Sequence, residues 1–293
     1  MTGLVIKAIS GFFYVKSGDL IYECRARGAL RNKEVVPLAG DTVEYTVVDS
    51  KSCVIDKVAK RKNDFVRPAI ANLDKLFIVS SCHTPAPNQL MIDRIISVAE
   101  SKGVEPIVVF NKSDLGDFGR LPEIYSQAGF ETHIVSCRTG EGIDRIKKSL
   151  SGCISAFTGN SGVGKSSIIN YIMPELALKT LDVSQKLGRG RHTTREVTLY
   201  SCNGGYLADT PGFSSIDIQR YEVILKEDLP NTFREFLKFS NDCCFTQCSH
   251  TKEKGCAVLK AVEDGLISES RHKNYCIIYD QIKDIKPWQV KKS

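Results

Sequence analysis

The chain has 293 residues, of which 42% are hydrophobic, and its 40 Lys and Arg against 34 Asp and Glu give a net charge of +6. This length leaves room for two or three domains with substantial hydrophobic cores. No run approaches the roughly 18 apolar residues of a membrane-spanning helix, so no membrane association is expected. Eleven cysteines would suit a disulfide-rich secreted protein only in a short chain with a signal peptide. Residues 1–15 lack a convincing cleavage site, which indicates reduced cysteines and a cytoplasmic location.

The first 62 residues hold most of the positive excess, with 11 Lys and Arg against 7 Asp and Glu. Short apolar runs alternate there with glycine-marked turns, and the runs cover residues 4–9, 12–15, 20–24, 42–48 and 53–58. Five short strands at this spacing predict a small β-barrel of the OB type, which often binds nucleic acid. A basic face would attract a phosphate backbone. A barrel that serves only as structural support is the alternative.

Between residues 63 and 220, predicted strands alternate with predicted helices. The strands cover residues 76–80, 106–110, 132–136 and 154–158, and the helices cover residues 90–101, 121–128, 143–150 and 165–172. This alternation is typical of a doubly wound α/β sheet. Residues 196–201 and 205–208, separated by Cys202-Asn203-Gly204, predict a β-hairpin.

A complete phosphate-binding loop, Gly-Asn-Ser-Gly-Val-Gly-Lys-Ser, lies between the predicted strand 154–158 and the helix that follows it. Its glycines let backbone N–H groups surround phosphates without a Cβ clash. Lys165 should neutralise the β- and γ-phosphates as a catalytic residue, and the Ser166 hydroxyl should coordinate Mg²⁺. The expected phosphate-binding residues are Gly159, Asn160, Ser161, Gly162, Val163, Gly164, Lys165, Ser166 and Ser167.

Asn111-Lys112-Ser113-Asp114 follows the predicted strand 106–110 and has the sequence of a guanine-recognition loop. The Asp114 carboxylate can accept hydrogen bonds from guanine N1 and N2, whereas adenine would leave it unpaired. The motif therefore favours GTP and GDP over adenine nucleotides. Ser136-Cys137-Arg138 follows the next strand, at the place of the loop whose backbone contacts guanine O6. These loops should converge because all of them leave the same edge of one parallel sheet.

Asp209-Thr210-Pro211-Gly212 ends an apolar strand downstream of the P-loop. Asp209 is expected to hold Mg²⁺ through water, and the Gly212 N–H can face the γ-phosphate. The basic, glycine-rich residues 187–195 lie between the two motifs and suit switch I. Thr194 should approach Mg²⁺ and the γ-phosphate in the GTP state.

Phe213 stands where Ras-like proteins carry a water-positioning glutamine. Phenylalanine cannot orient water, so we expect slow intrinsic hydrolysis, with His192 or a partner completing the catalytic site. A solvent-exposed loop histidine is the alternative role for His192.

The two nucleotide motifs occur in an unusual order. The guanine-recognition loop precedes the P-loop, whereas an ordinary small GTPase has the P-loop first. This inversion indicates a circular permutation, which domains tolerate because their termini tend to lie close together. One consequence is that the chain after Gly212 runs directly into the C-terminal region, so a γ-phosphate-dependent shift there could move that region.

Four potential metal ligands lie within fourteen residues near the C-terminus: Cys243, Cys248, His250 and Cys256. Three thiolates and one imidazole satisfy a closed tetrahedral zinc site, which is usually structural. The spacing alone does not exclude Cys244 in place of Cys243. Buried reduced cysteines without a metal are the alternative.

The order NKSD, GNSGVGKS, GRGRHTTR and DTPGF, followed by CxxxxCxHxxxxxC, resembles the circularly permuted GTPases of small ribosomal subunit biogenesis, the RsgA (YjeQ) family of bacteria. The resemblance covers essentially the whole chain, and Pro37-Leu38-Ala39-Gly40-Asp41 looks like the barrel of that family. It implies an OB-fold RNA-binding domain over residues 1–62, a circularly permuted GTPase domain over residues 63–220 and a helical zinc-binding domain over residues 221–293.

The resemblance also implies binding to the 30S subunit, with its 16S rRNA and ribosomal proteins, and release of assembly factors from it. Hydrolysis of GTP should be slow alone and faster on the 30S particle, and a monomer is expected. His192 matches the proposed catalytic histidine of the family, and the family's zinc ligands favour Cys243 over Cys244. Cys137-Arg138 departs from the Ala-Lys that is common in this loop of GTPases, but backbone contacts there should survive the change.

Two other functions fit parts of the sequence. One is an RNA-binding scaffold that holds nucleotide without meaningful turnover, which Phe213 leaves open. The other is a permuted GTPase that serves the large subunit or another RNA, against which the combination of barrel and zinc domain argues.

Overall fold

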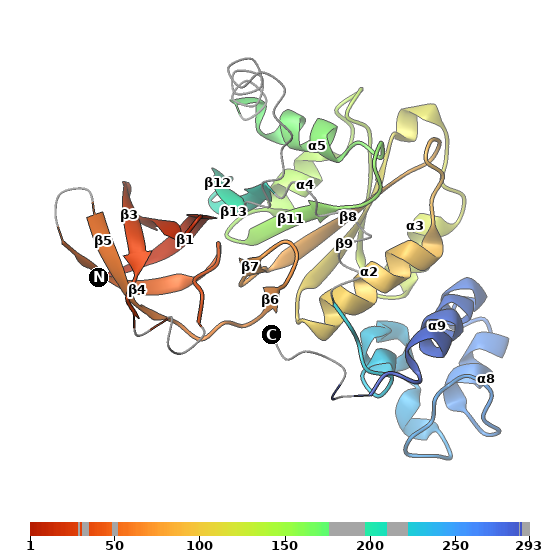
Figure 1. Ribbon diagram of the computed structural model, residues 1–293. Coiled ribbons are helices and arrows are strands. Elements are labelled where there is room, and N and C mark those ends of the chain that lie inside the picture. The colour runs from red at the N-terminus through yellow and green to blue at the C-terminus, as the bar shows by residue number, and fades with distance from the viewer. Residues whose placement is uncertain are drawn as a thin grey trace. The chain divides into compact units, whose positions relative to one another are not determined.

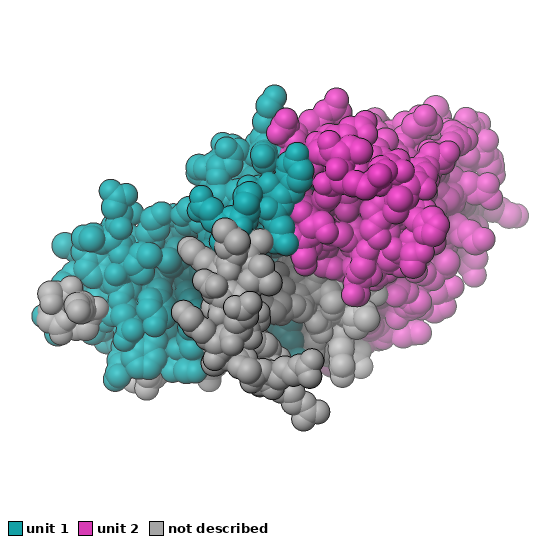
Figure 2. All heavy atoms as spheres, turned by 90° about the horizontal axis from the view of Figure 1, so that it is seen from above, with its two compact units in different colours: residues 1–75, 146–157, 169–213 teal, residues 76–145, 158–168, 214–293 magenta. Residues whose placement is uncertain are grey.

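The computed structural model describes residues 1–28, 30, 35–48, 52–175, 197–209, 222–286 and 288. The chain forms two compact units (Figure 2). Unit 1 comprises residues 1–75, 146–157 and 169–213, and unit 2 comprises residues 76–145, 158–168 and 214–293. No helix in the described part of the chain is long and apolar enough to span a membrane.

Unit 1 contains a five-stranded barrel (Figure 1). Its strands pair in the order β1-β2-β3-β5-β4, and β4 pairs again with β1, which closes the barrel. Alternate residues such as Val5, Phe13, Val15 and Ile55 are buried inside it, as the period of two in a strand requires. All five predicted strands are confirmed, with bounds β1 (Thr2–Ile9), β2 (Phe12–Ser17), β3 (Leu20–Ala26), β4 (Thr42–Val47) and β5 (Ser52–Val58).

Cys24 on β3 and Cys53 on β5 correct the prediction that all cysteines are reduced. The two strands run parallel in a register that sets these residues opposite each other, with Cα atoms 4.4 Å apart, and a disulfide joins them. The other nine cysteines are free. Strand register, which brings residues 29 positions apart together, is not visible in the cysteine spacing.

The Pro37–Asp41 motif connects the barrel to a short hairpin formed by β6 (Asp64–Phe65) and β7 (Ile70–Ala71). The buried Asp41 carboxylate accepts from Nε and Nη2 of Arg61, both at 2.8 Å, in a bidentate ion pair. Gly40 has φ +95°, and a Cβ there would overlap the carbonyl oxygen of Ala71. The motif therefore needs its glycine and its aspartate for chain packing.

Unit 1 also holds the predicted hairpin, formed by β12 (Thr198–Cys202) and β13 (Gly205–Asp209). The turn residues Asn203 and Gly204 have φ +49° and +74°, as a two-residue type I′ turn requires. β13 pairs in parallel with β11 (Ile154–Thr158), the strand that leads into the P-loop.

Unit 2 contains three predicted strands in the order β10-β9-β8: β8 (Lys75–Ser81), β9 (Glu105–Asn111) and β10 (Glu131–Val135). β8 and β9 are buried along almost their whole length, as expected of parallel strands covered on both faces. The four helices predicted between residues 63 and 220 are present. Unit 2 contains α2 (Gln89–Ser101) and α3 (Leu121–Gln127), while α4 (Ile143–Ser149) and α5 (Lys165–Ile172) each include residues of both units. Asn88 caps α2, with its Oδ1 accepting from the Met91 N–H at 3.0 Å.

The C-terminal part of unit 2 is built from short helices, in agreement with its predicted helical character. They are η2 (Leu229–Thr232), η3 (Arg234–Phe236), η4 (Ser240–Asp242), α8 (Ala257–Glu263) and α9 (Glu269–Ile282). Phe233, Phe236 and Tyr275 form its aromatic core, with ring centroids 4.8–5.2 Å apart. α2 contacts β9, η2 and α9 (Figure 1).

Candidate functional site

The P-loop glycines have packing roles besides access to phosphate. Gly159, Gly162 and Gly164 all have positive φ, between +82° and +137°. A Cβ on Gly164 would overlap the Nδ2 atom of Asn111, and a Cβ on Gly159 would overlap the carbonyl oxygen of Val79 on β8. Glycine at these positions lets the P-loop lie directly against the guanine-recognition loop and the sheet.

Lys165 begins α5 and turns its ammonium back over the P-loop. Its Nζ donates to the carbonyl oxygens of Gly159 at 2.7 Å and Asn160 at 2.8 Å. Partial burial lowers the pKa of this amine. Ser161, Ser166 and Ser167 are exposed, Asn160 is partly exposed and Val163 is buried.

Asn111 and Lys112 tie the guanine-recognition loop to the P-loop. Asn111 ends β9, is buried, and its Nδ2 donates to the carbonyl oxygen of Val163 at 2.9 Å. Lys112 has φ +69°, and its Nζ donates to the carbonyl oxygen of Gly162 at 2.7 Å. The predicted convergence of these two loops is confirmed, and both of them lie in unit 2.

Asp114 is held by the predicted third loop. Ser136 Oγ donates to Oδ1 of Asp114, and Arg138 Nε donates to Oδ2 at 2.6 Å. These two donors lower the pKa of the carboxyl group, Ser136 first. Ser113 starts the short helix η1 (Ser113–Leu115), and Cys137 Sγ lies 3.6 Å from Asn111 Oδ1. Asp114 is therefore a carboxylate, which is the acceptor that guanine N1 and N2 require.

The predicted magnesium and switch residues are only partly described. Asp209 is the last residue of β13 in unit 1, and burial raises the pKa of its carboxyl group. His192, Thr194, Gly212 and Phe213 lie outside the described residues.

Residues 82–85, just after β8, also contact the guanine-recognition loop, although the motifs gave no sign of it. Cys82 Sγ donates to the Lys112 carbonyl oxygen at 2.8 Å, and the Thr84 carbonyl oxygen accepts from Lys112 Nζ at 2.8 Å. Residues 82–85 thus contact both the backbone carbonyl and the side-chain ammonium of Lys112. The only indication of this role in the sequence was that residues 82–85 follow a parallel strand, at the sheet edge where binding loops gather.

The four predicted metal ligands form one cluster. One ligand atom each from Cys243, Cys248, His250 and Cys256 all lie within 4.8 Å of one another. Cys243 Sγ is 3.6 Å from His250 Nδ1 and 3.8 Å from Cys256 Sγ, and His250 Nδ1 is 3.4 Å from Cys256 Sγ. Tetrahedral zinc bonds would set such atoms roughly 3.5–3.8 Å apart. The cluster contains Cys243, while Cys244 is exposed and outside it.

The protonation chemistry of the cluster also suits a cation. Burial lowers the pKa of His250, so its imidazole is neutral and able to bind a metal. Burial raises the pKa of Cys248 to about 12, and the neighbouring thiols add to this effect. A divalent cation at this place would stabilise the thiolate forms that burial disfavours.

The loop that carries Cys248 and His250 is fixed from two sides. Glu253 accepts from the backbone N–H groups of residues 249, 251 and 252 at 2.9–3.1 Å. Although burial opposes ionisation, these donors and the Ser249 hydroxyl lower the pKa of Glu253 to about 2. From α9, His272 Nε2 lies 2.7 Å from the His250 carbonyl oxygen, and Tyr275 OH donates to the Ser249 carbonyl oxygen at 2.7 Å.

The chain resembles known proteins along almost its whole length. A model of the RsgA GTPase matches residues 58–219, and a model of the RsgA N-terminal domain matches residues 2–55. The chain is 42% identical to the small ribosomal subunit biogenesis GTPase RsgA of Caldanaerobacter subterraneus, over 96% of each chain. It is also 42% identical to the same enzyme of Geobacillus sp., over 97% of this chain and 98% of that one.

Two solved structures have the same fold. The crystal structure of YjeQ from Thermotoga maritima matches with a TM-score of 0.83 and 34% identity, over 97% of this chain and 99% of that one. YloQ, described as a circularly permuted GTPase, matches with a TM-score of 0.81 and 33% identity, over 98% of this chain and 96% of that one.

Proposed function

The chain belongs to the RsgA family and is a circularly permuted GTPase of small ribosomal subunit biogenesis, and on this basis we propose that its GTP cycle runs on the 30S subunit. The partner in this proposal rests on the family, and the observation that carries its nucleotide chemistry is the direct contact between the guanine-recognition loop and the P-loop in unit 2. Asn111 and Lys112 donate to the backbone of the P-loop, so one rigid assembly can hold the base and the phosphates together.

In this proposal Asp114 accepts from guanine, and the backbone of residues 136–138 faces its O6. The P-loop N–H groups and Lys165 neutralise the β- and γ-phosphates. The Ser166 hydroxyl and, in the GTP state, Thr194 would hold Mg²⁺, and Asp209 would hold it through water; the ion would supply positive charge against the phosphates. The exposure of Ser166 supports its role, because a metal ligand at this place must be reachable by the bound nucleotide.

The partner would be the 30S subunit, through its 16S rRNA and ribosomal proteins, and the protein would act there as a monomer in the cytoplasm and assist release of assembly factors. We assign RNA binding to residues 1–62, GTP hydrolysis to residues 63–220 and zinc binding to residues 221–293. The closed barrel and the basic excess of its sequence support the first of these assignments.

We also propose one structural zinc ion, held by Cys243, Cys248, His250 and Cys256. Four protein ligands leave no open position on a tetrahedral ion, so the metal would stabilise the fold and take no part in hydrolysis.

Steady-state GTP hydrolysis, measured alone and with purified 30S or 50S subunits, tests this function. We expect slow turnover alone, because Phe213 replaces a water-positioning glutamine, and an acceleration of at least about tenfold by 30S subunits, since a partner can supply the missing catalytic groups. His192→Ala should abolish most of the acceleration. Nucleotide binding without turnover under any condition would favour the RNA-binding scaffold, and stimulation by 50S subunits alone would favour a large-subunit factor.

A further inference from the structure

Helix α9 contacts two different parts of unit 2 through two adjoining faces. His272 and Tyr275 contact backbone carbonyl oxygens of the loop that carries Cys248 and His250. Arg271 and Asn274, each one position earlier, contact Asp93 of α2. Because residues three apart share a helix face, one turn of α9 joins the metal cluster to α2.

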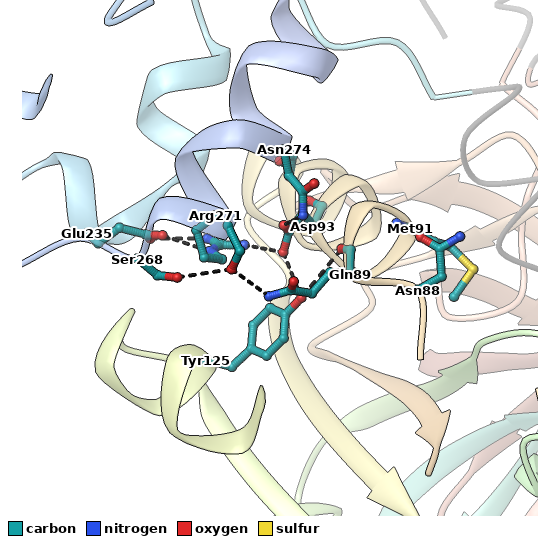
Figure 3. A network of polar contacts seen from close by, with 11 residues as sticks. Asn88, Gln89, Met91, Asp93, Tyr125, Glu235, Ser268, Arg271 and Asn274 are labelled. Carbon is teal, nitrogen blue, oxygen red and sulfur yellow. Dashed lines mark hydrogen bonds and ion pairs between the residues drawn. The ribbon is translucent and has the colours of Figure 1, made fainter. Parts of the chain in front are cut away.

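Asp93 is the centre of a buried polar network (Figure 3). Its Oδ1 accepts from Arg271 Nη1 and from Tyr125 OH, the latter at 2.9 Å, and its Oδ2 accepts from Asn274 Nδ2 at 2.6 Å. The guanidinium of Arg271 also forms a bidentate pair with Glu235, at 2.7 and 3.1 Å. The network therefore joins α2, α3, η3 and α9.

This network fixes the docking of α9 on α2. The Arg271 side chain is 1% exposed and that of Asp93 is fully buried, and the ring centroid of Phe233 lies 4.5 Å from the guanidinium carbon. Burial disfavours charge on Arg271, but the two carboxylates outweigh it and raise the pKa of the guanidinium. Separating α9 from α2 would leave buried charges without partners, which is strongly unfavourable.

The network includes residues of α2 and α3, the two helices that adjoin the guanine-recognition loop and its supporting segment 82–85 in the chain. α2 starts only a few residues after the segment 82–85 that holds Lys112. Its first residue, Gln89, donates from Nε2 to Ser270 Oγ at 3.0 Å. The backbone carbonyl oxygen of Gln89 lies 3.4 Å from the Tyr125 hydroxyl (Figure 3). Tyr125 lies on α3, the helix that follows Asp114 in the chain.

We propose that Arg271 and Asn274 are positioning residues for guanine recognition. By holding Asp93 they fix the start of α2 and, through residues 82–85, the position of Lys112; a contiguous set of hydrogen bonds and packed side chains can transmit such coupling. The inference rests on the proposed role of residues 111–114 in guanine binding. Since residues 82–85 contact Lys112 at the base-binding end of the site, a change in their position affects the binding of GDP and of GTP equally. Coupling through the chain after Gly212 would instead distinguish the two nucleotides.

The test measures the affinities of the full-length, zinc-loaded protein for fluorescent N-methylanthraniloyl GDP and for the same derivative of a non-hydrolysable GTP analogue. Asn274→Ala removes one donor to Asp93 and should lower the affinity for both nucleotides by about 3- to 10-fold, with the ratio of the two affinities unchanged. Arg271→Lys keeps a cation but cannot pair with Glu235 in a bidentate way, and it should weaken both at least as much. Lys273→Ala, an exposed position between them, is the matched control and should change neither affinity.

Hydrogen exchange separates positioning from general stability. At a temperature well below unfolding, Asn274→Ala should speed exchange in residues 82–88, while its zinc content stays at that of the unaltered protein. Unchanged affinities in Asn274→Ala and Arg271→Lys would overturn the proposal. A loss of affinity for the GTP analogue alone would also overturn the proposal, and would indicate coupling through the chain after Gly212 instead. Failure of the unaltered protein to prefer guanine over adenine nucleotides would contradict the proposed guanine site itself.

Discussion

Asp114→Asn is expected to change the base preference of the protein from guanine to xanthine. Guanine presents donors at N1 and N2, and the Asp114 carboxylate supplies the acceptors. Xanthine has a carbonyl oxygen in place of N2, and an asparagine amide can donate to it. Buried polar sites reject an unmatched partner by up to about 10⁴-fold, so GDP affinity should fall by roughly 10²–10⁴ while xanthosine diphosphate affinity rises.

Competition binding with GDP, xanthosine diphosphate and ADP measures this change. Asp117→Asn is the matched control, since Asp117 is an exposed aspartate three residues along the chain whose Oδ1 accepts from the Gly119 N–H. Asp114→Asn also removes the ionic partner of Arg138, but the Arg138 side chain is 70% exposed and water can replace the contact. Retention of the GDP preference by Asp114→Asn would remove Asp114 from the guanine site.

Cys248→Ser should abolish zinc binding and destabilise the C-terminal part of unit 2. Loss of one thiolate opens a closed four-ligand site, so the remaining three donors should hold zinc much more weakly. Elemental analysis should give one zinc per chain in the unaltered protein and none in the variant. Hydrogen exchange over residues 240–260 should rise sharply, and a chelator should produce the same change in the unaltered protein.

Cys244→Ser provides the control for this experiment. Cys244 adjoins a ligand in the sequence but is exposed and outside the cluster, so its replacement should leave zinc content unchanged. A metal-free unaltered protein that is fully folded would contradict the zinc assignment, and loss of zinc in Cys244→Ser would contradict the ligand set.

The sequence predicts the strands, helices and local motifs well because the chemistry of each is encoded within a few residues. The P-loop needs its glycines, and the Cys/His cluster lies within fourteen residues. The spacing alone left Cys243 and Cys244 equivalent, the family resemblance favoured Cys243, and the structure places Cys243 in the cluster.

Features that depend on distant contacts were not predictable in this way. Arg271 and Asp93 are 178 positions apart, and nothing near either residue distinguishes a buried arginine from the exposed ones around it. The Cys24–Cys53 disulfide depends on the parallel register of β3 and β5, which composition does not reveal. The contacts of Cys82 and Thr84 with Lys112 depend on a loop with no motif of its own.

Co-sedimentation with separated 30S and 50S particles tests most directly whether the GTP-bound protein binds the small ribosomal subunit. With a non-hydrolysable GTP analogue the protein should pellet with 30S subunits in a one-to-one ratio, and with GDP it should remain largely in the supernatant. Sedimentation with 50S subunits, or equal sedimentation with 30S subunits in both nucleotide states, would contradict GTP-dependent binding to the small subunit.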